Sequence, residues 1–509
     1  MSEAPPLHEL QIDLPAEEDT IALGGELSLF LRPGDWLLLS GDLGAGKSTL
    51  ARALIRALAP DAGPFEVHSP TFTLVQAYDF TRIPVAHADL YRIGGPDEVF
   101  ELGLDDLARD HVLLVEWPDR MDTPPPDRLE IALEHAGAGR RARLRGHGAW
   151  AARLERLAQA RRFLSGHCRA GCQRRFLMGD ASARRYERIA APGLPPAILM
   201  DMPERPDGPP LRDGRSYDEI AHLARSARAV WAIDTVLAER GFSAPRIFAH
   251  DLPHGLVLLE DLGDAVFGRL YARGEMEAPL AAAVDVLAAM AGQEWPGRVE
   301  TPAGTHRIAP YDDEAFLIEA ELLLDWFLPH VEGRRPDDAT RAEYRRIWLE
   351  LLPLARVGHP VWALRDYHSP NLIWLPDREG PARVGLIDTQ DALLGPAAYD
   401  LASLLQDARF TIPEAVEERM LERYLAARAA APGFDAGAHL AAHAVMGAQR
   451  AAKVLGIFVR LKERDAKPAY MAHIPRLRRY LARNLRHPAL APLAEWLRHH
   501  APSALPGEG

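Results

Sequence analysis

A glycine-rich stretch near the N-terminus has the residue spacing of a phosphate-binding loop. The segment GDLGAGKS (41–48) satisfies the pattern G-x-x-x-x-G-K-S/T, follows a strand-like apolar run and opens a helical pattern, which is the context that this pattern requires. Its glycines allow backbone N–H groups to turn inward around a polyanion, and the helix N-terminus adds partial positive charge. We therefore expect Ser48 to hold Mg²⁺ and ATP to contact Gly41, Asp42, Gly44, Ala45, Gly46 and Lys47.

Lysine is scarce in this chain, which makes Lys47 informative. It is the only lysine in the first 452 residues, and the others are Lys453, Lys462 and Lys467. An arginine fork is planar and bulky, whereas a pocket for three phosphate oxygens suits a compact, rotatable ammonium group. Lys47 is therefore explained by geometry rather than by charge.

Two carboxylates at the ends of apolar runs are candidates for the rest of a hydrolytic site. Asp89 follows VAHA in the segment HADLYR, and Glu116 ends the run HVLLVE. ATP hydrolysis requires metal ligands and a group that orients water, and carboxylates at the ends of strands commonly supply them. Asp89 and Glu116 are therefore candidate partners of Mg²⁺ and water.

A second set of polar residues indicates phosphoryl transfer. The segment ALRDYHSPNLIWL places Asp366 five residues before Asn371, the spacing of the kinase catalytic loop H-R-D-x-x-x-x-N, with Leu364 in place of the histidine. In such a loop the Asp accepts a hydrogen bond from the attacking hydroxyl, and the Asn binds Mg²⁺. The apolar run VGLI then delivers Asp388 as a second metal ligand.

Further residues are expected to support this second site. We expect Asp391 and Asp400 to hold the loop by hydrogen bonds, and His368 to pack in the loop or contact a sugar. The upstream segment LEDLG is expected to be a hinge between two lobes, where backbone groups from Glu260 to Leu262 contact adenine. Candidates for the lining of an acceptor pocket are Glu319, Glu321 and Trp326.

The phosphate anchor of the second site must differ from that of protein kinases. Those enzymes use a strand lysine, but no lysine occurs between positions 47 and 453, and Met200 occupies about the expected place. Arg184 and Arg185, which follow Ser182 in GDASARRY, are the nearest cations and could grip phosphates bidentately. The alternative is that these arginines are merely solvated.

The chain separates into two differently patterned parts. Up to about residue 145, short apolar runs alternate with helical stretches, as in α/β layers, and GHGA (146–149) is the expected linker. Beyond it, strand-like stretches come early and helical ones dominate after residue 310, which favours an α+β, two-lobed fold. We expect an α/β P-loop NTPase domain over 1–147 and the α+β domain over 148–509.

Composition excludes several classes of protein. With 48% hydrophobic and 26% charged residues the chain has the composition of a soluble globular protein, and no apolar run approaches the roughly 20 residues that a bilayer span needs. The acidic start lacks the features of a secretory signal, so we expect a cytoplasmic protein that binds no membrane. A net charge of −13 argues against coating of nucleic acid, and RRARLR (140–145) is expected to be a solvated strand. Cys168, Cys172 and His167 are too few for a structural zinc site, so ordinary thiols are expected.

Four motifs in the first part resemble those of the TsaE family, the ATPase subunit of the bacterial system that makes tRNA threonylcarbamoyladenosine. The motifs GDLGAGKST, SPTFTLVQAY, HADLYR and VEWP occur in this order within about residues 10–145. The family docks on the TsaD–TsaB pair and hydrolyses ATP, which implies protein partners and an indirect connection to tRNA. The resemblance implies phosphate and metal binding by Lys47, Ser48 and Thr49, nucleotide contacts by Thr71 and Trp117, and Mg²⁺ and water contacts by Asp89 and Glu116.

The second part resembles the aminoglycoside phosphotransferase-like, protein-kinase-like fold over about residues 150–500. Its segments GDASARRYERI, LEDLG, RDYHSPNL and IDTQDA are most similar to the cell-wall-recycling kinases that phosphorylate the anomeric hydroxyl of N-acetylmuramate and N-acetylglucosamine. Thr389 is a departure, because those kinases often carry an aromatic residue there. The resemblance implies ATP, Mg²⁺, a small sugar acceptor, Asp366 as the catalytic residue, and Asn371 and Asp388 as metal ligands.

Two other interpretations stay open at this point. The acceptor of the second domain could be an amino alcohol or an aminoglycoside, which are cationic and favour a pocket ringed by carboxylates. The first domain could be a nucleotide-dependent adaptor with little turnover. The preferred hypothesis is a two-headed enzyme in which each head uses its own ATP and Mg²⁺.

Overall fold

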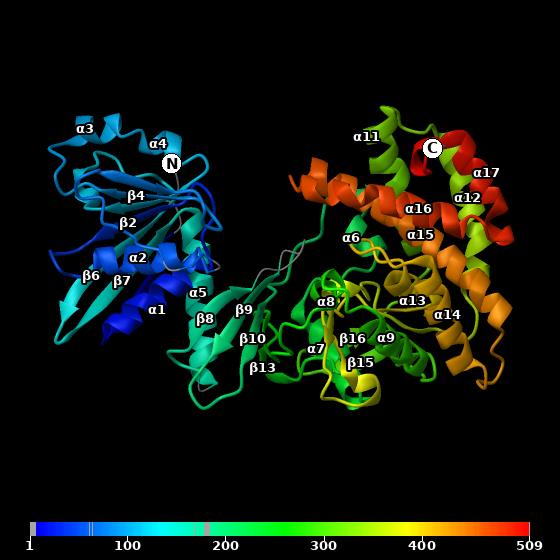
Figure 1. Cartoon of the computed structure of the whole chain (residues 1–509). Coiled ribbons are helices and arrows are strands. Elements are labelled where there is room, and N and C mark those ends of the chain that lie inside the picture. Colours follow the sequence, from blue (N-terminus) through cyan, green and yellow to red (C-terminus); the bar gives the residue numbers. More distant parts are fainter. Residues whose placement is uncertain (1–6, 61, 64, 168, 178–183, 508–509) are drawn as a thin grey trace. The chain divides into compact units, whose positions relative to one another are not determined.

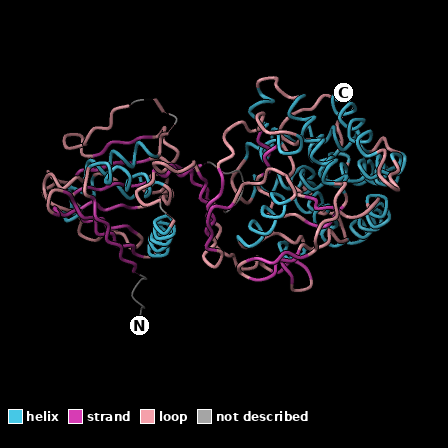
Figure 2. The backbone as a smooth tube through the Cα atoms, turned by 90° about the horizontal axis from the view of Figure 1, so that it is seen from below, coloured by secondary structure: helices cyan, strands magenta, loops and turns pink. Residues whose placement is uncertain are grey.

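The computed structural model describes residues 7–60, 62–63, 65–167, 169–177 and 184–507. Its contacts divide the chain into two compact units, Met1–Asp201 and Met202–Gly509. Strand is concentrated in the first unit and helix in the second (Figure 2). Among the described helices, none has both the length and the apolar character needed to cross a bilayer.

The first unit is built on a sheet whose strand order is β1-β7-β6-β2-β5-β4-β3 (Figure 1). Its strands are β1 (Leu7–Leu14), β2 (Trp36–Ser40), β3 (Val75–Tyr78), β4 (Val85–Asp89), β5 (Val112–Glu116), β6 (Arg128–Ala136) and β7 (Gly139–His147). Strand β2 is parallel to β5 and β6, and β5 is parallel to β4, whereas β1, β3 and β7 are antiparallel to their neighbours. The parallel centre confirms the predicted α/β class.

Both faces of this sheet are covered, which explains the continuous apolar sequence of β2. Leu37 and Leu39 belong to the core under three helices, and Trp36 and Leu38 belong to the core on the opposite face. The first face packs against α1 (Glu17–Ser28), α2 (Lys47–Ala57) and α5 (Ala149–Gly166), and the second against α3 (Pro96–Glu101) and α4 (Leu104–Leu107). A short 3-10 helix, η1 (Pro118–Arg120), follows β5.

Three further strands complete the first unit. β8 (Gln173–Leu177), β9 (Arg185–Ala190) and β10 (Ala197–Asp201) are antiparallel, and β8 packs against α1. An ion-pair cluster lies where β8 packs against α1. It consists of Glu26, Arg161, Arg174 and Glu187. The first compact unit therefore extends to Asp201, whereas the predicted domain boundary lies between residues 147 and 148. That boundary between two domains stays a prediction.

The second unit combines short strands with many helices. Its strands are β11 (Pro210–Arg212), β12 (Arg215–Ser216), β13 (Ile247–Asp251), β14 (Leu256–Glu260), β15 (Arg298–Thr301), β16 (Gly304–Arg307), β17 (Val361–Ala363), β18 (Leu372–Trp374), β19 (Val384–Leu386) and β20 (Leu393–Gly395). They form antiparallel pairs, namely β11–β12, β13–β14, β15–β16, β17–β20 and β18–β19.

Helices carry most of the apolar core of the second unit. They are α6 (Tyr217–Ile220), α7 (Ala227–Glu239), α8 (Phe267–Ala272), α9 (Glu277–Met290), α10 (Asp313–Ala320), α11 (Leu328–Glu332), α12 (Asp338–Ala355), α13 (Ala397–Leu405), α14 (Glu414–Arg428), α15 (Ala436–Glu463), α16 (Ile474–Asn484) and α17 (Ala491–His500). A π-helix, η2 (Leu323–Phe327), joins α10 to α11, and short 3-10 helices are η3 (Ser369–Asn371), η4 (Gly380–Arg383), η5 (Pro468–His473), η6 (Pro488–Leu490) and η7 (Pro502–Ala504).

The long helix α15 organises a large hydrophobic core of this unit. Val445, Leu455 and Val459 of α15 belong to a core shared with α10, α12, α13, α16 and α17. The helix passes very close to the end of α10, because a Cβ atom at Gly456 would lie 2.2 Å from the backbone oxygen of Leu322. Close approach therefore requires glycine at this position.

Candidate active sites

The phosphate-binding loop has the backbone that the sequence predicts. Gly46 caps the N-terminus of α2 with φ 106°, and Gly41 and Gly44 have φ 130° and 78°. A Cβ atom at Gly41 would lie 2.2 Å from the carbonyl oxygen of Leu133, so this glycine is needed for space as well as for conformation. The turn presents the first N–H groups of α2 as an anion site.

Lys47 lies inside this loop. Its ammonium donates to the carbonyl oxygens of Gly41 at 2.7 Å and Asp42 at 2.9 Å, and lies 3.9 Å from the ring centroid of Trp117. Burial lowers the pKa of Lys47, although the carboxylates of Glu116 and Asp89 oppose the shift. The ammonium is thus held at the centre of the loop, with Trp117 beside it.

Glu116 links the loop to the neighbouring strands. One of its carboxylate oxygens accepts from the hydroxyl of Ser48 at 3.1 Å, and the other lies 3.0 Å from Nε2 of His87. Both Glu116 and His87 are buried. The pairing of β4 with β5 creates this contact, and nothing in the local sequence distinguishes His87 from an ordinary buried histidine.

Asp89 lies beside the segment SPTFT, a contact that the sequence did not indicate. Its carboxylate accepts from the hydroxyls of Thr71 at 3.2 Å and Ser69 at 3.4 Å, and from the backbone N–H of Tyr91 at 3.1 Å. The ring of Tyr91 lies 5.1 Å from that of Trp117, which connects Asp89 with the lysine side of the site.

Two other residues border the loop. Thr49 lies in the first turn of α2, where its hydroxyl accepts from Arg52 at 3.4 Å. Arg140, the first arginine of RRARLR, reaches from β7 to donate to the carbonyl oxygen of Gly44 at 3.2 Å. The sequence did not indicate Arg140, because only the fold of the hairpin brings it to the loop. The other three arginines of this segment form surface ion pairs, namely Arg141–Asp13, Arg143–Glu134 and Arg145–Glu9, as expected of a solvated strand.

In the second unit, two short strands bring the predicted catalytic and metal-binding residues together. Leu372 of β18 pairs with Leu386 of β19, so Asn371 and Asp388, one residue before and two residues after these positions, lie close. The backbone confirms the proximity, since Ile387 N–H donates to the carbonyl oxygen of Asn371 at 3.1 Å. The side-chain amide of Asn371 donates to the carbonyl oxygen of Asp366 at 3.1 Å.

Buried carboxylates hold this loop through its backbone. Asp400 accepts from the N–H groups of Leu364 at 2.5 Å and Arg365 at 2.9 Å, and Asp391 accepts from Ala224 N–H at 2.6 Å. The contacts of Asp400 agree with the role expected of it in holding the loop, whereas the half-buried Asp391 holds the backbone at Ala224, ahead of α7, and not the loop. Asp407 fills a similar role that the sequence did not indicate, because it accepts from Ser369 N–H at 2.8 Å.

The catalytic candidate Asp366 is accessible and negatively charged. Its side chain is 45% exposed, and Nε2 of the buried His368 lies 3.6 Å from its carboxylate. Withdrawal from bulk water would raise the pKa of Asp366, but His368 and the positive charges of Lys453 and Arg365 outweigh it and lower this pKa. The carboxylate is therefore available to accept a hydrogen bond from an acceptor hydroxyl. The position of His368 fits loop packing.

Thr389 has a partner that explains its presence. Its hydroxyl donates to the carboxylate of Asp234 on α7 at 2.5 Å, and both side chains are buried. Burial raises the pKa of Asp234 to about 7, and the nearby charge of Asp388 adds to the shift. Phenylalanine could not satisfy this buried carboxyl, whereas the Thr389 hydroxyl does, so Thr389 and Asp234 belong together.

The structure gives different roles to the other residues that were predicted to contact the nucleotide. Glu260 ends β14, and its carboxylate binds Arg378 at 3.0 Å and Arg246 at 3.3 Å, so its side chain fixes the segment that precedes the buried Leu262. Arg185 lies on β9 with its guanidinium paired to Asp201 and Glu187 and stacked on Phe30, which favours a structural role over a phosphate contact. Arg184 immediately precedes β9, and Ser182 lies outside the described residues.

The expectation for the acceptor pocket is wrong for two of its three residues. Glu319 and Glu321 are fully buried and paired with cations, so they cannot meet an acceptor directly. Glu321 accepts from Arg212 at 2.6 Å and Arg345 at 3.1 Å, and Trp326 packs against the core.

Cys172 is buried, and burial raises its thiol pKa, while Cys168 lies outside the described residues.

Comparison with known proteins agrees with this division of sites. Residues 14–143 match the family described as threonylcarbamoyl adenosine biosynthesis protein TsaE, and residues 173–440 match the phosphotransferase enzyme family. The N-acetylmuramate/N-acetylglucosamine kinase of Caulobacter vibrioides is 40% identical over 358 residues, which are 68% of this chain and 97% of that protein. The TsaE protein of Rickettsia conorii is 37% identical over 124 residues, 24% of this chain and 69% of that protein.

The chain belongs to both families. The TsaE domain carries the phosphate-binding loop with Glu116 and Asp89, and the phosphotransferase domain carries Asp366, Asn371 and Asp388. Among solved structures, the GDP complex of aminoglycoside 2'-phosphotransferase-IIIa is similar to the phosphotransferase domain at 14% identity, with 64% of this chain and 99% of that chain covered and a TM-score of 0.41. The protein is thus an enzyme with an ATPase domain and a phosphotransferase domain.

Proposed function

We propose that this protein joins an ATPase that supports threonylcarbamoyladenosine formation in tRNA to a kinase that makes a sugar 1-phosphate. The acceptors of the kinase are N-acetylmuramate and N-acetylglucosamine, and the ATPase works on a TsaD–TsaB pair. The observation that carries the kinase assignment is the convergence of Asp366, Asn371 and Asp388 in a chain 40% identical to an N-acetylmuramate/N-acetylglucosamine kinase.

Mg²⁺ fits the donors at both sites. In the TsaE domain, the hydroxyl of Ser48 and a carboxylate oxygen of Glu116 lie 3.1 Å apart at the phosphate-binding loop, with Asp89 on the adjacent strand. In the phosphotransferase domain, Asn371 and Asp388 supply an amide oxygen and a carboxylate, which are hard ligands suited to this ion. When bound, Mg²⁺ neutralises phosphate charge.

The chain's own residues have distinct roles in the proposed kinase reaction. Asp366 accepts a hydrogen bond from the anomeric hydroxyl and orients its oxygen toward the γ-phosphate. Asp400 holds the backbone on the N-terminal side of Asp366, and Asp407 holds it at Ser369. The Asp366 carboxylate is ionised at neutral pH because its pKa is lowered, so it can accept this hydrogen bond without prior loss of a proton.

The test uses the full chain with ATP, Mg²⁺ and a panel of acceptors. We expect ³¹P NMR to detect an anomeric phosphate with N-acetylmuramate and N-acetylglucosamine. Phosphorylation of only amino alcohols or aminoglycosides would replace the sugar assignment by the cationic alternative.

The ATPase assignment is tested in the same preparation. We expect ATP hydrolysis that increases when TsaD and TsaB are added. Tight nucleotide binding without added turnover would instead indicate an adaptor.

A further inference from the structure

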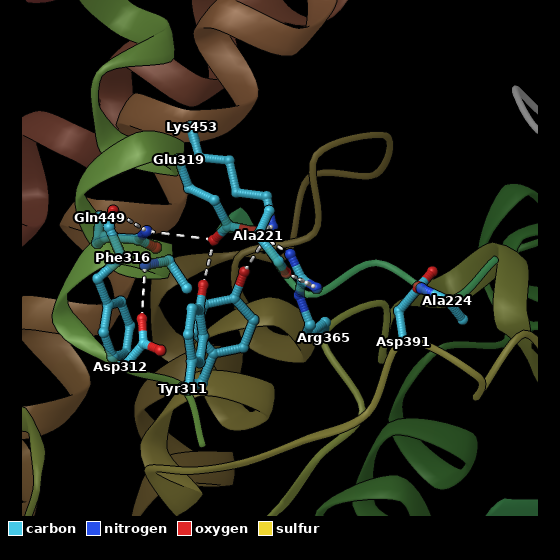
Figure 3. Close-up of polar contacts among 12 residues, drawn as sticks. Ala221, Ala224, Tyr311, Asp312, Phe316, Glu319, Arg365, Asp391, Gln449 and Lys453 are labelled. Atoms are coloured by element: carbon cyan, nitrogen blue, oxygen red, sulfur yellow. Dashed lines mark hydrogen bonds and ion pairs between the residues drawn. The ribbon is translucent and has the colours of Figure 1, made fainter. Parts of the chain in front are cut away.

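The helix α15 carries a lysine, Lys453, that is buried in the second unit together with a charged partner. The ammonium of Lys453 lies 2.7 Å from a carboxylate oxygen of Glu319 (Figure 3). It also lies 3.1 Å from the hydroxyl of Tyr399. Its side chain is 11% exposed, and that of Glu319 is fully buried. In the phosphoryl-transfer site described above, this lysine entered only through its charge, which helps to lower the pKa of Asp366.

Glu319 accepts from four side chains, which lie on three separate segments of the chain. The oxygen that binds Lys453 also accepts from the guanidinium of Arg365, and the second oxygen accepts from Tyr311 and from Gln449 at 3.4 Å (Figure 3). Nearby cations lower the pKa of Glu319 to about 2 even though burial opposes this shift. The carboxylate is thus an anion at neutral pH, and it joins α15 and α10 to the start of the catalytic loop.

Arg365 is the residue directly before Asp366, and its conformation is unusual. Its φ of 69° lies in the left-handed region, which a residue with a side chain rarely adopts. Such a conformation persists only when the surroundings fix it. Here the guanidinium is held by Glu319 and by the carbonyl oxygen of Ala221 at 2.9 Å, and the backbone N–H by Asp400 at 2.9 Å.

We propose that Lys453 is a positioning residue for phosphoryl transfer, because it fixes Glu319, which in turn fixes Arg365 and the direction of Asp366. This inference rests on the proposed kinase function and deepens it. Without Lys453, the buried carboxylate of Glu319 would lose its second cation, and only the uncharged Tyr311 and Gln449 would help it to orient Arg365. The left-handed residue would then relax, and the adjacent carboxylate would lose its alignment with the acceptor hydroxyl.

The experiment uses the full chain with Lys453→Met, which replaces the aliphatic part of the side chain by an unbranched apolar one and removes the charge. The matched control is Lys462→Met on the same helix, at a side chain that is 38% exposed. We expect Lys453→Met to lower kcat by about 10- to 100-fold, as a misplacement of reacting groups by about 1 Å does, with KM for ATP and acceptor within threefold of wild type. Lys462→Met should keep the wild-type kcat. Lys453→Arg, which restores the charge, should recover most of the loss.

A second readout does not depend on activity. Hydrogen exchange at the peptide containing Leu364 and Arg365, whose N–H groups donate to Asp400, should be about 10-fold faster in Lys453→Met, with the P-loop peptide unchanged. If Lys453→Met does not fold, Lys453→Gln is judged by the same two readouts. Wild-type kcat, a loss confined to KM, or unchanged exchange at this peptide would overturn the proposal. If the wild-type protein phosphorylates no acceptor, the proposed function fails, and the exchange experiment still decides whether Lys453 orders the loop.

Discussion

Replacement of Arg174 by methionine should destabilise the first unit by about 3 kcal/mol. Its guanidinium binds Glu187 at 2.7 and 3.0 Å and Glu26 at 3.4 Å, and the side chains of Arg174 and Glu187 are at most 1% exposed. Removal of one partner from a buried ion pair costs about 3–5 kcal/mol, because the remaining charge stays buried. The lower end applies here, since Glu187 keeps Arg185 at 3.3 Å and Glu26 keeps Arg161 at 2.6 Å.

Urea unfolding of the full chain, followed by hydrogen exchange at peptides of β8 and β9, measures this loss. The control is Arg141→Met, which removes an exposed pair with Asp13 and should cost less than about 1 kcal/mol. The double variant Arg174→Met/Glu187→Met removes both charges, so we expect it to be more stable than Arg174→Met alone. Equal stability of Arg174→Met and Arg141→Met would refute this reasoning. It would indicate that β8 does not contribute to the stability of the first unit.

Three other predictions concern the independence of the two domains, the packing of α15 and the effect of pH. Lys47→Ala should abolish ATP hydrolysis by the TsaE domain and leave acceptor phosphorylation intact, and Asp366→Ala should do the reverse; effects of each on both activities would show that the heads are not independent. Gly456→Ala should destabilise the second unit by about 1–3 kcal/mol in thermal unfolding, because the added methyl overlaps the facing helix backbone, whereas the exposed Gly437→Ala on the same helix should be neutral or stabilising; equal melting temperatures would contradict the close packing. Burial raises the pKa of Asp400 to about 7 from its ordinary 3.8, so between these pH values the folded state holds a proton that the unfolded state releases. The contribution of Asp400 to the free energy of unfolding should therefore fall as pH rises from about 4 to 7, and in urea titrations the difference between wild type and Asp400→Asn should change with pH in this direction; a difference independent of pH would contradict this assignment.

The sequence predicted those parts of the two sites that depend on short-range spacing. The loop around Lys47 and the segment from Asp366 to Asn371 are continuous, so residue type and spacing were sufficient. Asp388 was predicted as well, because a strand followed by a carboxylate is a local signal. These features need no knowledge of distant contacts.

Contacts between distant segments were beyond sequence reasoning. His87 meets Glu116 only through the pairing of β4 with β5, and Asp234 meets Thr389 from a separate helix. Glu319 was a candidate for the lining of an acceptor pocket, but it is fully buried. Its burial is possible only because Arg365 and Lys453, 46 and 134 positions away, converge on it. A pattern read along one helix contains no information about such partners.

The distribution of lysines makes the protein unusually simple to probe with acylating reagents. Lys462 and Lys467 are both partly exposed, so these two amines should react readily in the native state. Lys47 and Lys453 are 5% and 9% exposed and bound to oxygen acceptors, so their modification would require local opening. The rate of acylation at Lys47 or Lys453, measured by mass spectrometry, therefore reports how fast the corresponding domain opens locally. The two rates can be measured separately.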